Sequence, residues 1–129
     1  MEVLLVEKDP LIRDLVKVGL QQFGEFQVTV GEGHTGVGEA RSHRFDTVIL
    51  GVDPADQDSM KLLQHLRSFE TEADLFLLAD AGNVKDLAAT KGKFDVHSVV
   101  QTPIKPKDLF GMMSRYLERR GERSQPAAR

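Results

Sequence analysis

Residues 3–15 read VLLVEKDPLIRDL, and this stretch indicates how the chain folds. Residues 3–6 are apolar without interruption, which is typical of a strand that helices cover on both faces. Asp9 can cap a helix, Pro10 can occupy its first turn, and Gly24 can end it. The apolar positions of that helix are Leu11, Leu15, Val18 and Phe23. A buried strand that leads directly into an amphipathic helix is the first part of a strand-helix-strand unit.

The same alternation continues along the chain. Unbroken apolar runs recur at residues 48–50, 75–78 and 99–100, and residues 26–30 alternate, which places that strand nearer an edge. Between these runs, stretches with the periodicity of a helix lie at about residues 35–43, 58–68, 84–91 and 106–120. We therefore expect one α/β domain over residues 1–120, with a five-stranded parallel sheet, right-handed crossovers and five flanking helices. Residues 121–129 are polar, and we expect a flexible tail or the start of a linker there.

Composition narrows the classes of function. The 129 residues are 40% apolar and 29% charged, as in an ordinary globular domain. The 17 Lys and Arg against 20 Asp and Glu give a net charge of −3, so we expect no direct binding of nucleic acid. The chain has no Cys, which excludes disulfides, thiolate nucleophiles and Cys-ligated metal sites. Neither a signal peptide nor a membrane span is visible, and we expect a cytoplasmic protein without membrane contact.

The candidates for chemistry are the residues that follow each apolar run. In an open α/β sheet, ligands bind beyond the carboxyl ends of the strands. The residues at those positions are Glu7, Lys8, Asp9, Gly51, Val52, Asp53, Ala79, Asp80, Thr102 and Pro103.

Three segments resemble CheY-like response-regulator receiver domains. They are VLLVEKDPLIRDL at residues 3–15, FDTVILGVDPADQDSMKLL at residues 45–63 and VVQTPIKPKDL at residues 99–109, which look like the first, third and fifth strand-plus-loop segments of that family. The resemblance covers about residues 2–120. It implies a doubly wound sheet with the strand order 2-1-3-4-5, and a role in two-component, phosphorelay-type signal transduction.

The residues that carry phosphotransfer in the family are replaced here. The resemblance puts the phosphoacceptor position on Gly51, which has no side chain, and the acidic metal-binding pair on Glu7 and Lys8. The other matched positions hold Ala79 for a hydroxyl residue, Thr102 for a lysine and Val99 for the switch aromatic. We therefore expect a pseudo-receiver, a non-enzymatic module without cofactor or metal that works through protein contacts. Because Lys8 and Gly51 remove two oxygen donors, we expect Mg²⁺ to bind no better than millimolar.

Each of these positions also has a plain structural interpretation. Gly51 could form only a tight bend, and Lys8 could be a solvated surface charge, although we expect it to pair with Glu7, Asp53 or Asp56. An alternative function is an atypical receiver that still accepts a phosphoryl group or binds Mg²⁺ through Asp53 or Asp56. The family's habit also implies a cis peptide between Thr102 and Pro103.

Three other patterns do not indicate a ligand site. The histidines at positions 34, 43, 65 and 97 lack the spacing of paired metal ligands, so we expect surface or helix-end residues. Residues 31–38, GEGHTGVG, lack the Lys-Ser/Thr of a P-loop and contain a carboxylate, so they read as a loop entering the second helix. The loop EKDP after the first strand lacks the hydroxyl-rich cradle that a flavin phosphate needs.

The last helix carries a wide apolar stripe that we expect to face the sheet, made of Leu109, Phe110, Met113, Tyr116 and Leu117. Met112 lies off that stripe beside Gly111, which suits either an adaptable protein contact or ordinary packing at a helix edge. In receiver domains, the face built from the fourth helix, fifth strand and fifth helix carries dimerisation and output contacts. The resemblance therefore implies that a protein partner or a second copy binds there, through Lys85, Val99, Gly111 and Met112.

Overall fold

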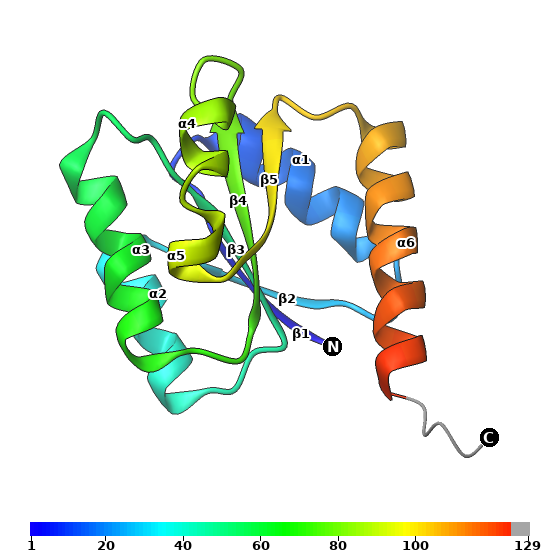
Figure 1. Ribbon diagram of the computed structural model, residues 1–129. Coiled ribbons are helices and arrows are strands. Elements are labelled where there is room, and N and C mark those ends of the chain that lie inside the picture. The colour runs from blue at the N-terminus through cyan, green and yellow to red at the C-terminus, as the bar shows by residue number, and fades with distance from the viewer. Residues whose placement is uncertain (125–129) are drawn as a thin grey trace.

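The computed structural model describes residues 1–124, in which strands and helices alternate (Figure 1). The strands are β1 (Glu2–Val6), β2 (Gln27–Gly31), β3 (Thr47–Gly51), β4 (Asp74–Asp80) and β5 (Val96–Thr102). The helices are α1 (Pro10–Gln21), α2 (Gly33–Ser42), α3 (Gln57–Phe69), α4 (Val84–Ala88), α5 (Lys91–Phe94) and α6 (Pro106–Ser124).

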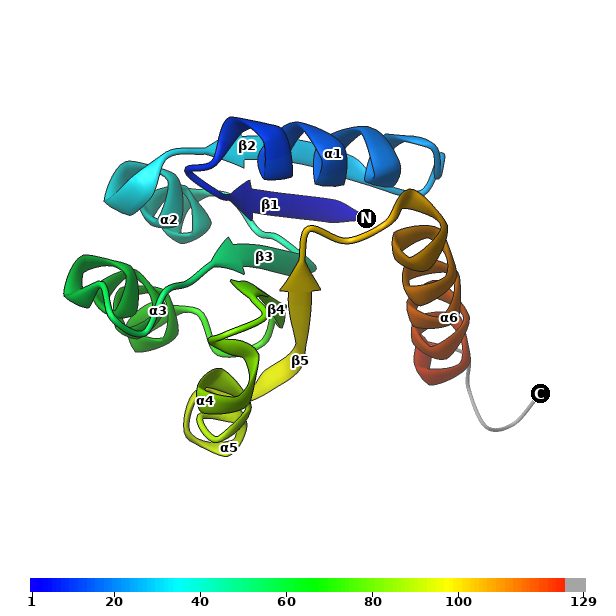
Figure 2. The same ribbon diagram turned by 90° about the horizontal axis from the view of Figure 1, so that it is seen from above.

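The five strands form one parallel sheet in the order β2-β1-β3-β4-β5, which confirms the expected fold class and strand order. Val3 of β1 pairs with Val28 of β2 on one side and with Thr47 of β3 on the other. Figure 2 shows the twist of the sheet, because β1 and β5 point in clearly different directions.

Two apolar cores lie on the two faces of the sheet. Successive strand residues face opposite sides, so Leu4 belongs to the core under α2 to α5, and Val3 and Leu5 belong to the core under α1 and α6. The first core also contains Val48, Leu50, Leu63, Leu66, Leu75, Leu77 and Leu87, and the second contains Val16, Leu20, Ile49, Phe76, Leu109 and Met113. Burying each such side chain contributes about 1.5–3 kcal/mol, and both cores position the strand ends that carry the site.

Helix α1 begins where the sequence predicts. The Asp9 carboxylate accepts the backbone N–H groups of Leu11 and Ile12 at 2.9 and 3.4 Å, and Pro10 occupies the first turn. Two of its four expected apolar positions are nevertheless exposed, Leu11 by 83% and Val18 by 57%. The fully buried residues of this helix are Val16 and Leu20, because positions four apart share one helix face.

The prediction of a single helix at residues 84–91 is wrong. Two short helices, α4 and α5, occupy this region, so the described part of the domain has six helices instead of five. Helix α4 ends at Ala88, and the Thr90 hydroxyl then donates to the Leu87 carbonyl at 2.7 Å. That bond gives the backbone an alternative to continuing the helix. Helix α5 ends at Phe94, and the capping residue after it, Asp95, has a φ of 52° in the left-handed region.

Helix α6 runs to Ser124, past the expected end of the folded domain at residue 120, and the rest of the expected tail, residues 125–129, lies outside the described residues. Its apolar stripe is narrower than expected. Phe110 is 50% exposed and stacks on Phe23 with ring centroids 4.9 Å apart, at the edge of the second core. Met112, in contrast, is half-buried and packs against that core. Of the two roles expected for Met112, the structure therefore shows ordinary packing at a helix edge.

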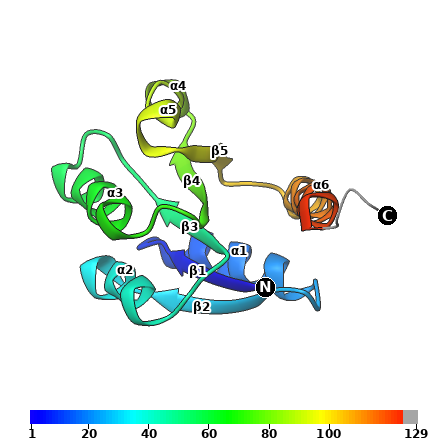
Figure 3. The same ribbon diagram turned by 60° about the horizontal axis from the view of Figure 1, so that its bottom comes forward.

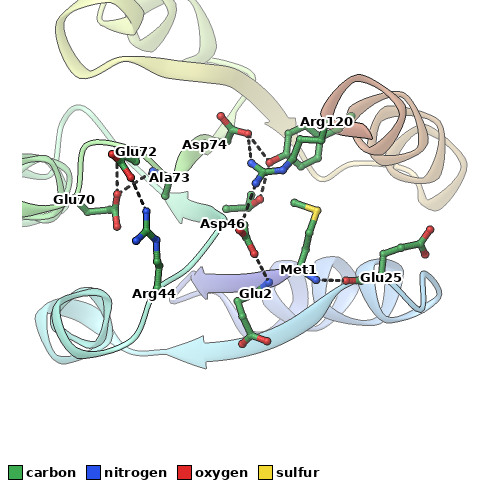
Figure 4. A network of polar contacts seen from close by, with 12 residues as sticks. Met1, Glu2, Glu25, Arg44, Asp46, Glu70, Glu72, Ala73, Asp74 and Arg120 are labelled. Carbon is green, nitrogen blue, oxygen red and sulfur yellow. Dashed lines mark hydrogen bonds and ion pairs between the residues drawn. The ribbon is translucent and has the colours of Figure 1, made fainter. Parts of the chain in front are cut away.

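A polar network at the amino ends of the strands fastens α6 to the sheet (Figure 4). Arg120 donates to Asp74 at 2.8 Å and to Asp46 at 3.3 Å. Asp46 also accepts the backbone N–H of Glu2 at 2.8 Å, at the start of β1. We call this group the amino-end clasp; its members are Glu2, Asp46, Thr47, Asp74, Tyr116 and Arg120.

Candidate functional site at the carboxyl end of the sheet

The carboxyl ends of the strands surround a cleft of about 470 Å³. All six residues that the sequence assigns to a degenerate phosphoacceptor pocket line it: Glu7, Lys8, Gly51, Asp53, Ala79 and Thr102. These residues are distant in sequence, and the parallel order of β1, β3, β4 and β5 brings them to one edge.

The carboxyl group of Glu7 lies where a side chain at position 51 would lie. A Cβ built on Gly51 would come within 2.6 Å of Glu7 Cδ and 2.8 Å of Glu7 Oε2, closer than real Cβ atoms approach. Gly51 does not have a positive φ, so any L-residue could adopt its backbone conformation. A side chain at position 51 would therefore clash with Glu7, whereas no tight bend of the backbone requires glycine there.

Glu7 is held in this position by the loop that follows β1. Its Oε2 accepts the backbone N–H of Asp9 at 3.1 Å. Burial of about half of the group raises the pKa of the Glu7 carboxyl above its ordinary value of 4.5, and the backbone N–H groups of Asp9 and Lys8 oppose that shift. The carboxyl therefore holds its proton more readily than a solvated glutamate does.

Lys8 pairs with Asp56, one of its three expected partners. The Lys8 ammonium lies 3.3 Å from Oδ2 of Asp56, and this hydrogen bond is the main reason that the pKa of Asp56 is lowered. The Lys8 side chain is nevertheless 82% exposed, so the pair lies at the solvated rim of the cleft. Asp56 also caps α3 by accepting the backbone N–H of Asp58 at 3.0 Å.

Asp53 is engaged by its own loop and by a neighbouring one. Its Oδ1 accepts the backbone N–H of Ala55 at 2.9 Å and the side-chain N–H of Asn83 at 3.4 Å, and its backbone N–H donates to the Ser59 hydroxyl at 2.9 Å. Asn83 and Ser59 are not among the site residues predicted from the sequence. Asn83 could have been predicted, because this residue also follows a strand at the same edge of the sheet.

The far wall of the cleft is buried and offers little polarity. Ala79 is 3% exposed and Thr102 is 5% exposed. The peptide between Thr102 and Pro103 is cis, as predicted. Within residues 1–124, no group of three His, Asp or Glu side chains is arranged to hold a metal ion.

Solved structures share this architecture over nearly the whole chain. The REC domain of AraT, a response regulator from Geobacillus stearothermophilus, superposes with a TM-score of 0.79 at 16% identity, covering 96% of this chain and 98% of that one. The receiver domain of NtrX from Brucella abortus gives a TM-score of 0.74 at 20% identity, covering 90% and 98%. The chain has the fold of a CheY-like receiver domain. This confirms the resemblance that the three sequence segments indicate.

Curated sequences related to this receiver fold belong to transcriptional regulators. The probable transcriptional regulatory protein TcrX of Mycobacterium tuberculosis is 31% identical over 87 residues, 67% of this chain and 37% of that protein. The transcriptional activator protein IrlR of Burkholderia pseudomallei is 32% identical over 79 residues, 61% of this chain and 34% of that protein. The chain thus spans about a third of the length of the curated relatives it matches. No family model matches it.

The expected interaction face of the receiver fold is spread over three elements. Figures 1 and 3 show α4 and α6 on either side of β5, which is an edge strand. Lys85 is exposed on α4, while Val99 is half-buried and packs against the first core. Gly111 and Met112 are half-buried on α6, where Met112 packs against the second core. Val99 and Met112 therefore face opposite sides of the sheet, and Lys85 is the exposed member of the set.

Within residues 1–124, every helix falls short of what a membrane-crossing segment requires in length and hydropathy.

Proposed function

We propose that this chain is a pseudo-receiver, a non-enzymatic module of two-component signalling that acts through protein contacts and takes no phosphoryl group. One observation carries the proposal. The position that the family uses as phosphoacceptor is Gly51, and the Glu7 carboxyl group occupies the space where an acceptor side chain would project.

The chemistry of the cleft supports this proposal. Phosphoryl transfer depends on electrostatic stabilisation by a bound cation and positioned donors, and a hard divalent ion needs several oxygen ligands. Here Lys8 places a cation at the rim instead of a second carboxylate, and Ala79 offers no hydroxyl. Glu7 is the one carboxylate left at the position of the family's acidic pair, and a single carboxylate is a weak site for a hard divalent ion.

The two alternative acceptors are already engaged. Asp53 accepts hydrogen bonds from Ala55 and Asn83, and Asp56 is paired with Lys8 and caps α3. A phosphoryl group on either carboxylate would replace these contacts, so the alternative of an atypical, still phosphorylated receiver is disfavoured.

The curated relatives are named as transcriptional regulators, and we extend only the signalling class to this chain. The partner in our proposal is a protein or a second copy of the chain. The surface proposed for it is the edge formed by α4, β5 and α6.

Incubation with acetyl phosphate and Mg²⁺, followed by intact-mass measurement, tests the proposal. We expect no phosphoryl adduct on the wild-type chain, and calorimetric titration should give a Mg²⁺ constant no tighter than millimolar. A matched variant with Glu7→Asp, Lys8→Asp and Gly51→Asp reinstates the family's three carboxylates and should bind Mg²⁺ more tightly. A wild-type adduct that disappears in Asp53→Asn, Asp56→Asn or Glu7→Gln would show that a displaced carboxylate still serves as acceptor.

A further inference from the structure

Two histidines far apart in sequence meet between α2 and α3. His34 lies in the first turn of α2, and His65 lies in the last two turns of α3. Their Nδ1 atoms are 3.3 Å apart and their ring centroids are 5.4 Å apart. Both helices lie on the same face of the sheet and pack against each other (Figure 1).

A carboxylate lies on the other side of the His34 ring. Oδ1 of Asp58 is 3.5 Å from Nε2 of His34. A carboxylate at this nitrogen favours the tautomer with the proton on Nε2, which leaves the Nδ1 lone pair directed toward His65. A carboxylate behind an imidazole is also the usual arrangement behind a histidine that ligates a metal.

The separation of the two Nδ1 atoms matches that of two ligands on one tetrahedral metal. Bonds from zinc to imidazole nitrogen of about 2.0–2.1 Å, opened to a near-tetrahedral angle, separate the two nitrogens by roughly 3.3–3.4 Å. The pair therefore needs little movement of either helix to accept an ion.

We propose that His34 and His65 form a two-histidine site for a divalent transition metal of the class that prefers imidazole, such as Zn²⁺ or Cu²⁺, with Asp58 as a positioning residue. Neutral imidazole nitrogens suit zinc and copper, whereas Mg²⁺ prefers oxygen ligands. No third His, Asp or Glu among residues 1–124 completes a closed shell, so water fills the remaining coordination positions. The His34 side chain is 47% exposed, which leaves room for that water.

The proposed metal site does not depend on the proposal that the chain takes no phosphoryl group. It bridges α2 and α3 beside the cleft, which Asp58 and Gly33 also line. An ion held there links the two helices, and the free energy of unfolding should therefore rise with the logarithm of the ion concentration above its dissociation constant. Spacing along the sequence cannot indicate such a site, because its ligands come from two helices.

Calorimetric titration of the full chain with ZnCl₂ tests the proposal, with Cu²⁺ electron paramagnetic resonance to count nitrogen ligands. We expect one ion per chain, two nitrogen ligands, and at least a tenfold loss of affinity in His34→Gln and in His65→Gln. Asp58→Asn should weaken binding by a smaller factor. His43→Gln is the matched control, because His43 also lies 3.3 Å from a carboxylate oxygen, on Glu2, but its described ring neighbour is Phe45 and not a second histidine.

The alternative is a simple hydrogen bond between the two rings. Wild-type chain that takes up no Zn²⁺ would overturn the proposal in favour of that bond. Equal losses in His43→Gln and His65→Gln would equally overturn it, because they would indicate nonspecific surface binding. Displacement of Zn²⁺ by excess Mg²⁺ would place the ion among the carboxylates of the cleft and also contradict the proposal.

Discussion

Glu7 is a half-buried carboxyl group whose burial outweighs the attraction of the nearby Lys8 cation, and this should make the stability of the chain depend on pH. Its pKa is raised in the folded state, so the folded chain binds the proton more tightly than the unfolded chain. The free energy of unfolding should therefore fall as pH rises from about 4.5 through the raised value. At pH 7 the ionised group is a net cost.

We predict that Glu7→Gln raises the free energy of unfolding at pH 7 by less than about 1 kcal/mol, since solvent screens a half-exposed group. The same change should remove part of the decline above pH 4.5. Urea denaturation of both proteins between pH 4 and pH 8 measures the effect. A variant that is less stable than wild type at pH 7, with the decline unchanged, would contradict this account of Glu7.

The contact between Glu7 and Gly51 makes a second prediction. A methyl group added in Gly51→Ala meets the Glu7 carboxyl, which must swing out of the cleft. We expect a cost of about 1 kcal/mol in the wild-type background and almost none in a Glu7→Ala background, which is a coupling of contacting residues. Urea denaturation of the four proteins gives the coupling energy. Gly38→Ala, at a helical position with open space around it, is the control and should show no coupling to Glu7.

The hydroxyl of Tyr116 joins α6 to two strands within the amino-end clasp. That hydroxyl lies 2.7 Å from the Thr47 hydroxyl and 2.7 Å from the Asp74 carboxylate, and Tyr116 is buried. Burial, with the hydrogen bond to Asp74, raises the pKa of Tyr116 to about 12, while the hydrogen bond from Thr47 opposes the shift.

We predict that Tyr116→Phe costs about 1–3 kcal/mol, because it leaves the buried hydroxyl of Thr47 and the partly buried carboxylate of Asp74 with one partner fewer. The folded chain keeps the phenol proton to a higher pH than the unfolded chain, so stability should decline between about pH 10 and about pH 12, and this component should be absent in the variant. Thermal unfolding at pH 8 and pH 11 measures both effects. A variant as stable as wild type at pH 8 would remove Tyr116 from the clasp.

The elements themselves could be predicted from the sequence, but the contacts between them could not. Unbroken apolar runs indicate β1, β3 and β4 because both sheet faces are covered. Which face of α1 is exposed depends on where the sheet and α6 lie. The sequence therefore predicts Leu11 and Val18 to be buried, although both face solvent. The break between α4 and α5 coincides with a hydrogen bond from the Thr90 side chain, which helical periodicity does not encode.

The sequence predicts which residues line the candidate site, but it does not predict the directions and contacts of their side chains. The family resemblance places Glu7 and Gly51 at neighbouring strand ends, and the register of β1 and β3 then brings them together. Which way the Glu7 side chain turns, and which loop carboxylate Lys8 meets, depends on packing that no short motif encodes. His34 and His65 meet only because α2 and α3 share one face of the sheet.

A substitution of Lys85, the exposed lysine of α4, tests the proposed interaction face of the molecule. We predict that Lys85→Glu shifts any self-association toward monomer by at least threefold while leaving the thermal midpoint nearly unchanged, since a surface substitution costs less than about 0.5 kcal/mol. Sedimentation equilibrium measures the association. Lys61→Glu, an exposed cation on α3, is the control.

An equal response of the two lysine variants, or a wild-type chain that stays monomeric at every concentration, would exclude self-association through this face. Met112→Glu is a poorer probe than the sequence suggests. Because Met112 packs against the second core, a charge there should lower stability as well as any binding.

The two oxygens of Asp46 hold opposite ends of the described chain, Oδ2 at the first strand through Glu2 and Oδ1 at the last helix through Arg120. A mechanical load applied between those ends is therefore shared by Asp46, by the contacts of Arg120 and Tyr116 with Asp74, and by the pairing of β1 with its neighbours. Under tension, the Arg120 contacts should rupture first, and α6 should peel off as a unit while the β1, β3 and β4 ladders remain closed. We expect these polar contacts, and not the strand ladders, to set the order in which the molecule comes apart under force.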